Sequence, residues 1–384
     1  MRGYIKKRYK TGGYTIVVPL GRDPVTGKYK QHWETYKGTK VEAEKRLAEL
    51  QTELFSGSFV KPQKQTVAEY LNFWLEDVAK PRIAPTTYKC YKYIISRHLI
   101  PELGSIPLPK LNGPTIQRYY SSKLKCPRQD GKQGDTISAR TVQSHHRLLH
   151  KALKFAVTNG LIMHNATDNT EPPVPENKEI KPMTEGQLTT FLAKLKGSPY
   201  YELFYTALFT ALRRSEILAL RWEDIDLENG YLTVNRVMHY INGKFLFREP
   251  KTEKSKATIS LTPSTIALLE NYKQRRAGEC LLLGIEFKAS ELAFCHADGS
   301  PILPNTITRY WQRFSRRIGI PGLRLHDARH THATLMIKRG INLKVVQERL
   351  RHTRVETTLG LYTHVLPGMQ EEAARLFDDY APKQ

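Results

Sequence analysis

A proline-rich segment near the middle of the chain most constrains how this sequence can fold. Residues 165–182 contain Pro172, Pro173, Pro175 and Pro182 among asparagine, aspartate and glutamate side chains. Proline fixes φ and donates no backbone hydrogen bond, so the segment is expected to be a stiff, extended linker. The chain should therefore fold as separate units on either side, as its length of 384 residues also suggests.

Residues 1–60 are expected to form a small DNA-binding domain. The first 40 residues carry ten lysines and arginines but only two acids. Strand composition over 14–20 and 28–36 predicts a three-stranded sheet, and apolar spacing over about 41–54 predicts one helix. A basic sheet of this size fits a DNA major groove. Six aromatic residues are expected mostly to fill its thin core, and they are Tyr4, Tyr9, Tyr14, Tyr29, Trp33 and Tyr36.

Residues 65–165 are expected to form a helical domain, joined by a linker at 166–182 to a third domain, 183–384. Apolar residues recur at helical spacing through the second domain. Proline and glycine mark where its helices begin and end. Four helices are expected. The first begins at Thr66, the second spans 86–99 and is closed by Pro101, the third spans 114–124, and the fourth spans 139–158 and is capped by Gly160.

The last of these helices carries a basic face. Four cationic side chains share one side of it, while its apolar residues lie largely on another. Such a stripe is often only a solvated surface. However, the whole chain has 60 Lys and Arg against 37 acids, a formal charge of +23, which predicts a polyanionic partner. A helix that faces double-stranded DNA is therefore the favoured interpretation, and a merely soluble basic protein or one bound to acidic lipid is the alternative. The four residues are Arg140, Arg147, Lys151 and Lys154.

Composition also argues against several other classes of protein. No run of about 18 apolar residues is present, which argues against a membrane-spanning protein, and no signal-peptide pattern opens the chain. The four cysteines lack Cys-x-x-Cys spacing, which argues against a zinc ribbon or a disulfide framework. A reducing, intracellular location is therefore expected, without a membrane partner.

The third domain is expected to be mainly helical with a small antiparallel sheet. Its first half reads as helical over 200–220. Strand-like alternation begins at Tyr231, Asn242-Gly243 predicts a hairpin turn, and 256–261 predicts a further strand. Helices are expected from Pro263 onward.

This domain contains a set of residues suited to breaking a phosphodiester. Two arginines can hold the phosphate between guanidinium groups, a tyrosine hydroxyl can attack it, and a lysine can protonate the leaving oxygen. Arg213 follows an apolar helix, and Ser215 is expected to cap the next one. The candidate residues are Arg213, Lys251, His326, Arg329, His352 and Tyr362.

Each candidate also has an ordinary structural interpretation. Arg213 is placed to pair with Glu216, and Lys251 lies in a lysine-rich turn that is commonly just solvated, with Lys254 as an alternative proton donor. The spacing of His326 and His330, with His332 nearby, also allows a zinc site, although no further ligand is evident in the sequence.

Taken together and in this order, the motifs resemble those of the tyrosine recombinase, or phage integrase, family. The segment Thr210-Ala-Leu-Arg-Arg-Ser-Glu216 resembles the first arginine motif, His326-Asp-Ala-Arg329 resembles His-x-x-Arg, and Leu361-Tyr-Thr-His364 matches the nucleophile segment. Two departures stand out. Ala211 and Arg351 each occupy a position where glycine is usual, and the second puts the backbone around Leu350-Arg-His352 in doubt.

The resemblance implies a site-specific recombinase with an arm-site domain, a core-site domain and a catalytic domain. Arg213 and Arg329 would clamp the phosphate, His326 and His352 would assist, Lys251 would be the general acid, and Tyr362 would form a 3′-phosphotyrosine. No metal, ATP or other cofactor is expected. The implied partners are core and arm attachment sites, a homotetramer on DNA, and an excision factor or host DNA-bending protein.

Three other functions stay open at this point. A type IB topoisomerase shares the chemistry but needs no partner site, and a chromosome-dimer resolvase normally lacks the extra amino-terminal domain. A DNA-binding regulator that kept the fold without catalysis is the third alternative. Trapping a covalent protein–DNA adduct distinguishes an enzyme from a regulator.

Overall fold

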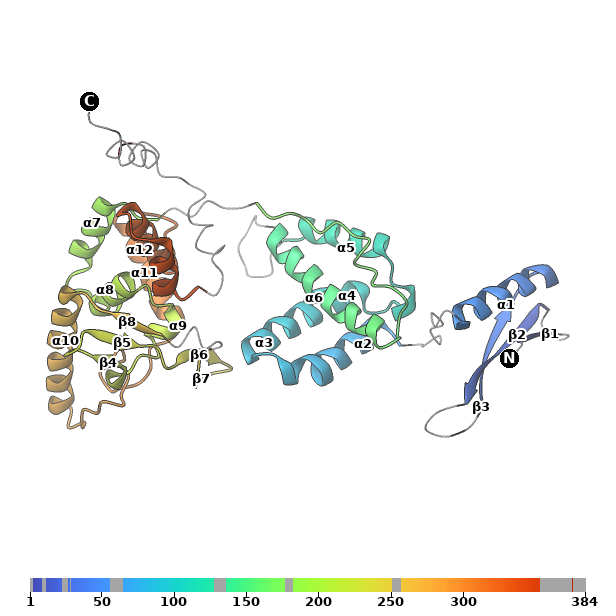
Figure 1. Ribbon diagram of the computed structural model, residues 1–384, viewed down its shortest axis with the longest axis horizontal. Coiled ribbons are helices and arrows are strands. Elements are labelled where there is room, and N and C mark those ends of the chain that lie inside the picture. The colour runs from blue at the N-terminus through green and yellow to red at the C-terminus, as the bar shows by residue number, and fades with distance from the viewer. Residues whose placement is uncertain are drawn as a thin grey trace, which may run out of the picture. The chain divides into compact units, whose positions relative to one another are not determined.

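The chain divides into two compact units, Met1–Asn177 and Lys178–Gln384. The expected fold class is confirmed, because the protein is mainly helical, with an amino-terminal three-stranded sheet and small antiparallel sheets in its second unit (Figure 1). None of the described helices is both long and apolar enough to span a bilayer. The computed structural model describes residues 3–8, 12–22, 27, 29–55, 65–127, 136–176, 182–250, 257–352 and 375.

The amino-terminal sheet is covered on one face by a single helix. Its antiparallel strands lie in the order β1 (Tyr4–Lys7), β2 (Tyr14–Arg22) and β3 (Tyr29–Tyr36), and α1 (Lys40–Phe55) lies beside them (Figure 1). Alternate side chains of β2 pack against α1, which produces a core of Ile16, Val18, Ala43 and Leu50. The predicted sheet and helix are confirmed.

The prediction that most aromatics of this region fill the core is wrong. Tyr4, Tyr29 and Trp33 are 50%, 59% and 59% exposed. The strand register places Tyr4 and Trp33 on either side of Val17, on the face away from the core residues of β2. One helix covers only one face of a sheet, so period-2 alternation leaves these side chains on the open face. Of the other aromatics, Tyr14 and Tyr36 pack partly buried against the core, and Tyr9 lies outside the described residues.

The helical part of the first unit has its own apolar core, which includes Trp74, Tyr120 and Leu149. The predicted end of a helix at Pro101 is wrong, because helical structure continues to Leu103. Proline lacks an N–H, and a π-helical turn over Ile95–Leu99 absorbs the irregularity just before it. The helical segments are α2 (Val67–Phe73), η1 (Trp74–Ala79), η2 (Lys80–Arg82), α3 (Pro85–Ile94), η3 (Ile95–Leu99), α4 (Ile100–Leu103), η4 (Leu108–Lys110), α5 (Gly113–Lys125) and α6 (Ala139–Thr158).

The second unit packs helices around a large apolar core and two small sheets. The predicted hairpin at Asn242-Gly243 is confirmed, and both residues have positive φ. The strand expected over 256–261 is observed as Thr258–Ser260, which pairs with β5 and does not join this hairpin. The described part of this unit therefore contains two sheets rather than one. The strands are β4 (Ile225–Asp226), β5 (Tyr231–Thr233), β6 (Val237–Ile241), β7 (Lys244–Arg248) and β8 (Thr258–Ser260).

The helices of this unit position the candidate site. Figure 1 shows α10 beside the sheet that contains β4, β5 and β8. The buried rings of Phe191, Phe204 and Trp311 join α7, α8 and α11 in one core. The helices are α7 (Glu185–Leu195), α8 (Tyr201–Thr210), α9 (Arg214–Ile217), η5 (Trp222–Asp224), α10 (Pro263–Leu282), α11 (Pro304–Arg317), α12 (Asp327–Lys338) and α13 (Leu343–Leu350).

Candidate active site

Arg213 lies in a short break between two helices. Helix α8 ends at Ala211, which adopts the left-handed conformation (φ 53°, ψ 28°). The chain then turns through Arg213, which is extended (φ −72°, ψ 152°) and serves as the N-cap of α9. The prediction that Ser215 caps this helix is wrong, because α9 begins one residue earlier and the carboxylate of Glu216 accepts the Arg213 backbone N–H at 2.8 Å.

The left-handed residue explains why the family usually has glycine at this point. A side chain in this conformation costs roughly 1–2 kcal/mol relative to the right-handed one. Ala211 is fully buried, and its carbonyl oxygen accepts a hydrogen bond of 2.7 Å from Arg329 Nη1. Alanine has the smallest side chain after glycine, and the surrounding contacts hold it in place.

Arg329 is a buried cation with an incomplete set of partners. It is 3% exposed, and its Nη2 has no hydrogen-bond partner among the described residues. Burial, and then the neighbouring charges of Arg213 and Arg351, lower the pKa of Arg329 to about 9. A buried guanidinium with a free N–H beside other cations forms a strong binding site for an anion.

Two histidines lie in the field of the same arginines. His326 is the N-cap residue of α12, as the sequence predicted for the start of a helix. Burial, and then the charge of Arg329, lower the pKa of His326, and burial followed by Arg329 and Arg213 lowers the pKa of His352 to about 4. Both imidazoles are therefore neutral near pH 7, so each can donate through one nitrogen and accept through the other.

Arg351 also adopts a left-handed conformation, with φ 54° and ψ 45°. This resolves the doubt about the local backbone, because arginine here takes the conformation that glycine would take. Its side chain is 3% exposed and donates to Glu216 Oε2 at 2.7 Å. Its own carbonyl lies 3.5 Å from Arg213 Nη2.

His332 and Arg349 support the end of α8, a role that the sequence did not reveal. A carbonyl oxygen only accepts, so His332 donates from Nδ1 to Leu208 O at 2.9 Å, and its Nε2 accepts from Arg349 Nε at 3.0 Å. Arg349 also donates to Phe209 O at 3.0 Å. These bonds satisfy carbonyls that a helix end leaves unpaired. The zinc interpretation gains no support, because the described residues contain no group of three possible metal ligands.

Lys251, Lys254 and Tyr362 lie outside the described residues. Of the six candidate catalytic residues, the structure therefore places Arg213, His326, Arg329 and His352, and the charges of the two arginines lower the pKa of both histidines.

The basic face of α6 is exposed, as predicted. Its four residues are solvent-exposed while the apolar face is buried, and within the described part of the chain none of the four forms an ion pair with a carboxylate. Lys151 Nζ lies 5.7 Å from the ring centre of Tyr91, and Arg147 Nη2 donates to Gln143 Oε1 at 2.9 Å. The cationic charge of this face is available to a polyanion.

Helix α11 carries a second basic face that the sequence analysis missed. Arg309, Arg313 and Arg316 recur at helical spacing, are exposed, and line a hollow of about 350 Å³. Arg214 Nη1 donates to Thr308 Oγ1 at 2.7 Å, which ties this helix to the residue after Arg213. The spacing of the arginines would have been a sufficient signal.

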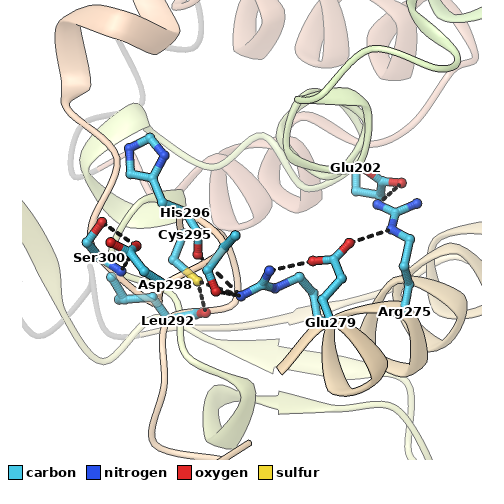
Figure 2. Close-up of polar contacts among 10 residues, drawn as sticks. Glu202, Arg275, Glu279, Leu292, Cys295, His296, Asp298 and Ser300 are labelled. Atoms are coloured by element: carbon cyan, nitrogen blue, oxygen red, sulfur yellow. Dashed lines mark hydrogen bonds and ion pairs between the residues drawn. The ribbon is translucent and has the colours of Figure 1, made fainter. Parts of the chain in front are cut away.

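A separate polar cluster, around Arg275 and Arg276 of α10, stabilises the segment before α11 (Figure 2). Arg276 is 5% exposed and donates to the carbonyls of His296 and Ala297 at 3.3 and 3.4 Å. It also pairs with Glu279, while Arg275 pairs with Glu202 at 2.8 Å (Figure 2). Both cations pair with carboxylates within the cluster, which is consistent with a structural role.

Two family profiles match the chain. Residues 181–369 match the profile described as the Phage integrase family, and residues 66–124 match the profile described as Phage integrase, N-terminal SAM-like domain. Among curated proteins, a Tyrosine recombinase XerC-like protein of Caldanaerobacter subterraneus subsp. tengcongensis is 29% identical, with 95% of this chain and 96% of that protein covered. The ICEBs1 integrase of Bacillus subtilis is 26% identical, with 97% and 99% covered.

Solved structures share the fold. The Tn1549 transposon integrase in complex with a circular intermediate DNA has a TM-score of 0.69 at 20% identity, covering 81% of this chain and 99% of that chain. A lambda integrase tetramer bound to a Holliday junction has a TM-score of 0.55 at 20% identity, covering 91% and 95%.

Proposed function

Because this chain belongs to the phage integrase family of tyrosine recombinases, enzymes that cleave and rejoin DNA, we propose that it integrates or excises a mobile element at specific sites. The observation that carries the proposal is that Arg213 and Arg329 are both anchored at the carboxyl end of α8. Arg213 lies in the break that follows this helix and is held by Glu216, and Arg329 comes from α12 and is held by the Ala211 carbonyl. Their field acts on two neutral histidines.

The arginines would bind the non-bridging oxygens of the scissile phosphate. Negative charge on these oxygens grows in the pentacovalent transition state, and fixed cations in a buried site stabilise it without reorganising. Arg329 offers its free Nη2, and Arg213, whose side chain is 35% exposed, is accessible to DNA. The neutral imidazoles of His326 and His352 would hydrogen-bond the phosphate and assist proton transfer.

Tyr362 would attack the phosphorus through its hydroxyl oxygen. A neutral imidazole, that of His326 or His352, would accept the proton of the Tyr362 hydroxyl as the 3′-phosphotyrosine bond forms. The P–O5′ bond would break, and Lys251 would deliver a proton to the departing 5′-oxygen. Attack by the 5′-hydroxyl of a partner strand reverses these steps and joins the exchanged strands. The phosphodiester energy is kept in the protein–DNA bond, so strand exchange needs no nucleotide hydrolysis.

DNA would be held by basic surfaces in each of three domains, 1–60, 65–165 and 183–384. The exposed face of α6 would contact core-site DNA through Arg140, Arg147, Lys151 and Lys154. The open face of the amino-terminal sheet would contact arm-site DNA through exposed Tyr4, Lys6 and Trp33. Strand exchange requires two duplexes, so the active assembly would be a homotetramer on DNA, with an excision factor or host DNA-bending protein setting direction, in a prokaryotic cytoplasm.

A covalent trap tests this function. A core-site duplex is nicked so that the short fragment bearing the newly formed 5′-hydroxyl diffuses away after cleavage. This duplex should accumulate a protein–DNA adduct, and peptide mapping should locate the link at Tyr362. Tyr362→Phe should form no adduct but bind the duplex with nearly unchanged affinity, because binding depends mostly on phosphate contacts from lysine and arginine. An adduct that persists in Tyr362→Phe, or the absence of any adduct in the parent, would overturn the proposal.

A further inference from the structure

One buried carboxylate serves two arginines in the candidate site. Glu216 is 3% exposed, and its Oε1 accepts from Arg213 Nη1 at 2.7 Å. Its Oε2 accepts from Arg351 Nη2 at 2.7 Å and from the Arg213 backbone N–H at 2.8 Å. Burial would raise the pKa of Glu216, but the charges of Arg351 and then Arg213 outweigh burial and lower it. Arg351 is thus a second counter-ion for this carboxylate, beside Arg213.

Arg351 has unused hydrogen-bonding capacity. It stands where the family usually has glycine, and its Nε and Nη1 are buried without a hydrogen-bond partner among the described residues. Only Nη2 contacts Glu216, so the guanidinium meets the carboxylate through one nitrogen. An arginine side chain can instead hold both oxygens of a carboxylate in a two-pronged arrangement.

This capacity matters when Arg213 binds a phosphate. Arg213 Nη1 is occupied by Glu216, so a guanidinium that turns toward DNA withdraws a hydrogen bond from Oε1. A buried carboxylate that loses its cation is strongly disfavoured. Without another cation, Glu216 would hold Arg213 back and compete with the phosphate for it.

We propose that Arg351 is a positioning residue that keeps Glu216 paired, and thereby frees the Arg213 side chain to turn to the scissile phosphate. The inference rests on the proposed function for the role of Arg213. Arg351 acts through Glu216 rather than on the substrate, because it is 3% exposed and its side-chain hydrogen bond among the described residues is to Glu216.

Three substitutions at Arg351 separate the effect of its side-chain charge from the effect of its backbone conformation. Arg351→Gly removes the side chain and suits the left-handed backbone, Arg351→Met removes the charge but keeps most of the bulk, and Arg351→Lys keeps the charge. Asn242→Gly is the matched control, because Asn242 is also a left-handed non-glycine residue (φ 51°) but lies in the β6–β7 turn. Each variant is compared with the parent for adduct formation on the nicked duplex and for DNA affinity.

Arg351→Gly and Arg351→Met should form the adduct more slowly, on the order of 10²-fold, as expected when a reacting group is misplaced. Their dissociation constants for DNA should match the parent value. Arg351→Lys should recover most of the rate, and Asn242→Gly should behave like the parent. Parent-like rates in Arg351→Met, or a loss of affinity without slower cleavage, would overturn the inference, the latter because it indicates direct DNA contact.

A stability measurement keeps this inference separate from the proposed function. Thermal unfolding of Arg351→Met, Glu216→Gln and the double variant forms a cycle that needs no DNA. Sharing of the carboxylate predicts that Arg351→Met destabilises the parent much more than it destabilises Glu216→Gln. Additive effects would refute the pairing even if the parent cleaves DNA. If the parent forms no adduct but the cycle shows coupling, the proposed function fails while the contact between Arg351 and Glu216 stands.

Discussion

Acid should destabilise the helical part of the first unit through a buried histidine of α6. His145 is fully buried, and its Nδ1 is 2.9 Å from the Tyr119 hydroxyl. Its ring centre is 4.6 Å from that of His98, and Lys123 and Glu102 form a neighbouring ion pair. Burial, and then the charges of His98 and Lys123, lower the pKa of His145 from 6.5 to about 3.

The direction and size of the effect follow from this pKa. The unfolded chain binds the proton more readily, so the stabilising contribution of neutral His145 is complete above pH 6.5 and is lost as the pH falls from 6.5 toward about 3. Because pH 5 lies about 1.5 pH units below the unfolded pKa of 6.5, the free energy of unfolding should decrease there by roughly 2 kcal/mol. The pKa of His98 is also lowered, chiefly by burial, so it adds to the decrease in the same direction.

Hydrogen exchange of peptides from α6 measures this decrease locally. After correction for the intrinsic pH dependence of exchange, protection should fall between pH 7 and pH 5 by about 30-fold, the equivalent of 2 kcal/mol. His145→Gln keeps a polar partner for Tyr119 but cannot take up the proton, so its protection should be lower at pH 7 yet much less dependent on pH. An equally steep pH dependence in His145→Gln would refute the assignment to this histidine.

Three further predictions concern DNA. The Lys251→Ala variant should cleave ordinary DNA about 10²- to 10⁴-fold more slowly than the parent. It should cleave DNA with a 5′-bridging phosphorothiolate at nearly the parent rate, because sulfur leaves without a proton. If Lys254→Ala is rescued by the phosphorothiolate and Lys251→Ala is not, Lys254 is the general acid. Replacing all four basic residues of α6 with glutamine should weaken binding to core-site DNA. The slope of log affinity against log salt concentration should become shallower by about 0.9 for each DNA phosphate that the variant no longer neutralises. An unchanged slope would contradict the assignment of this face of α6 to DNA binding. Deleting residues 1–60 should abolish recombination between full sites but leave cleavage of a short core-site duplex, and equal loss of both activities would argue against a separate arm-binding domain.

Features governed by local sequence were predictable. The bounds of α6, Ala139–Thr158, agree with the prediction because the apolar period, the capping residue Ser138 and Gly160 are all local signals. The hairpin at Asn242-Gly243 was recognised for the same reason, since its positive φ values favour these residue types. The start of α12 beside His326 belongs to the same group.

Features that depend on distant contacts were not predictable. The Arg329 contact with the Ala211 carbonyl spans 118 positions, and the Arg351 contact with Glu216 spans 135. No local pattern indicates that an arginine in a glycine position will share a carboxylate with another motif. The exposed face of the amino-terminal sheet was missed for a related reason, because composition identifies a sheet but does not show which face the single helix covers.

The carboxyl end of α8 is the common reference for both candidate phosphate-binding arginines. A helix leaves its last carbonyls unpaired, and here side chains from α12 and α13 bind three of the carbonyls at this end. One of these donors is Arg329 itself, and Arg213 follows only two residues after the carbonyl that Arg329 holds. The spacing between the two guanidinium groups is therefore set by the position of the helix end rather than by either side chain alone. A displacement of α12 relative to α8 would move Arg329 relative to Arg213. Arg349 bonds both His332 of α12 and the Phe209 carbonyl of α8, so it helps to set the geometry in which the two arginines meet a phosphate.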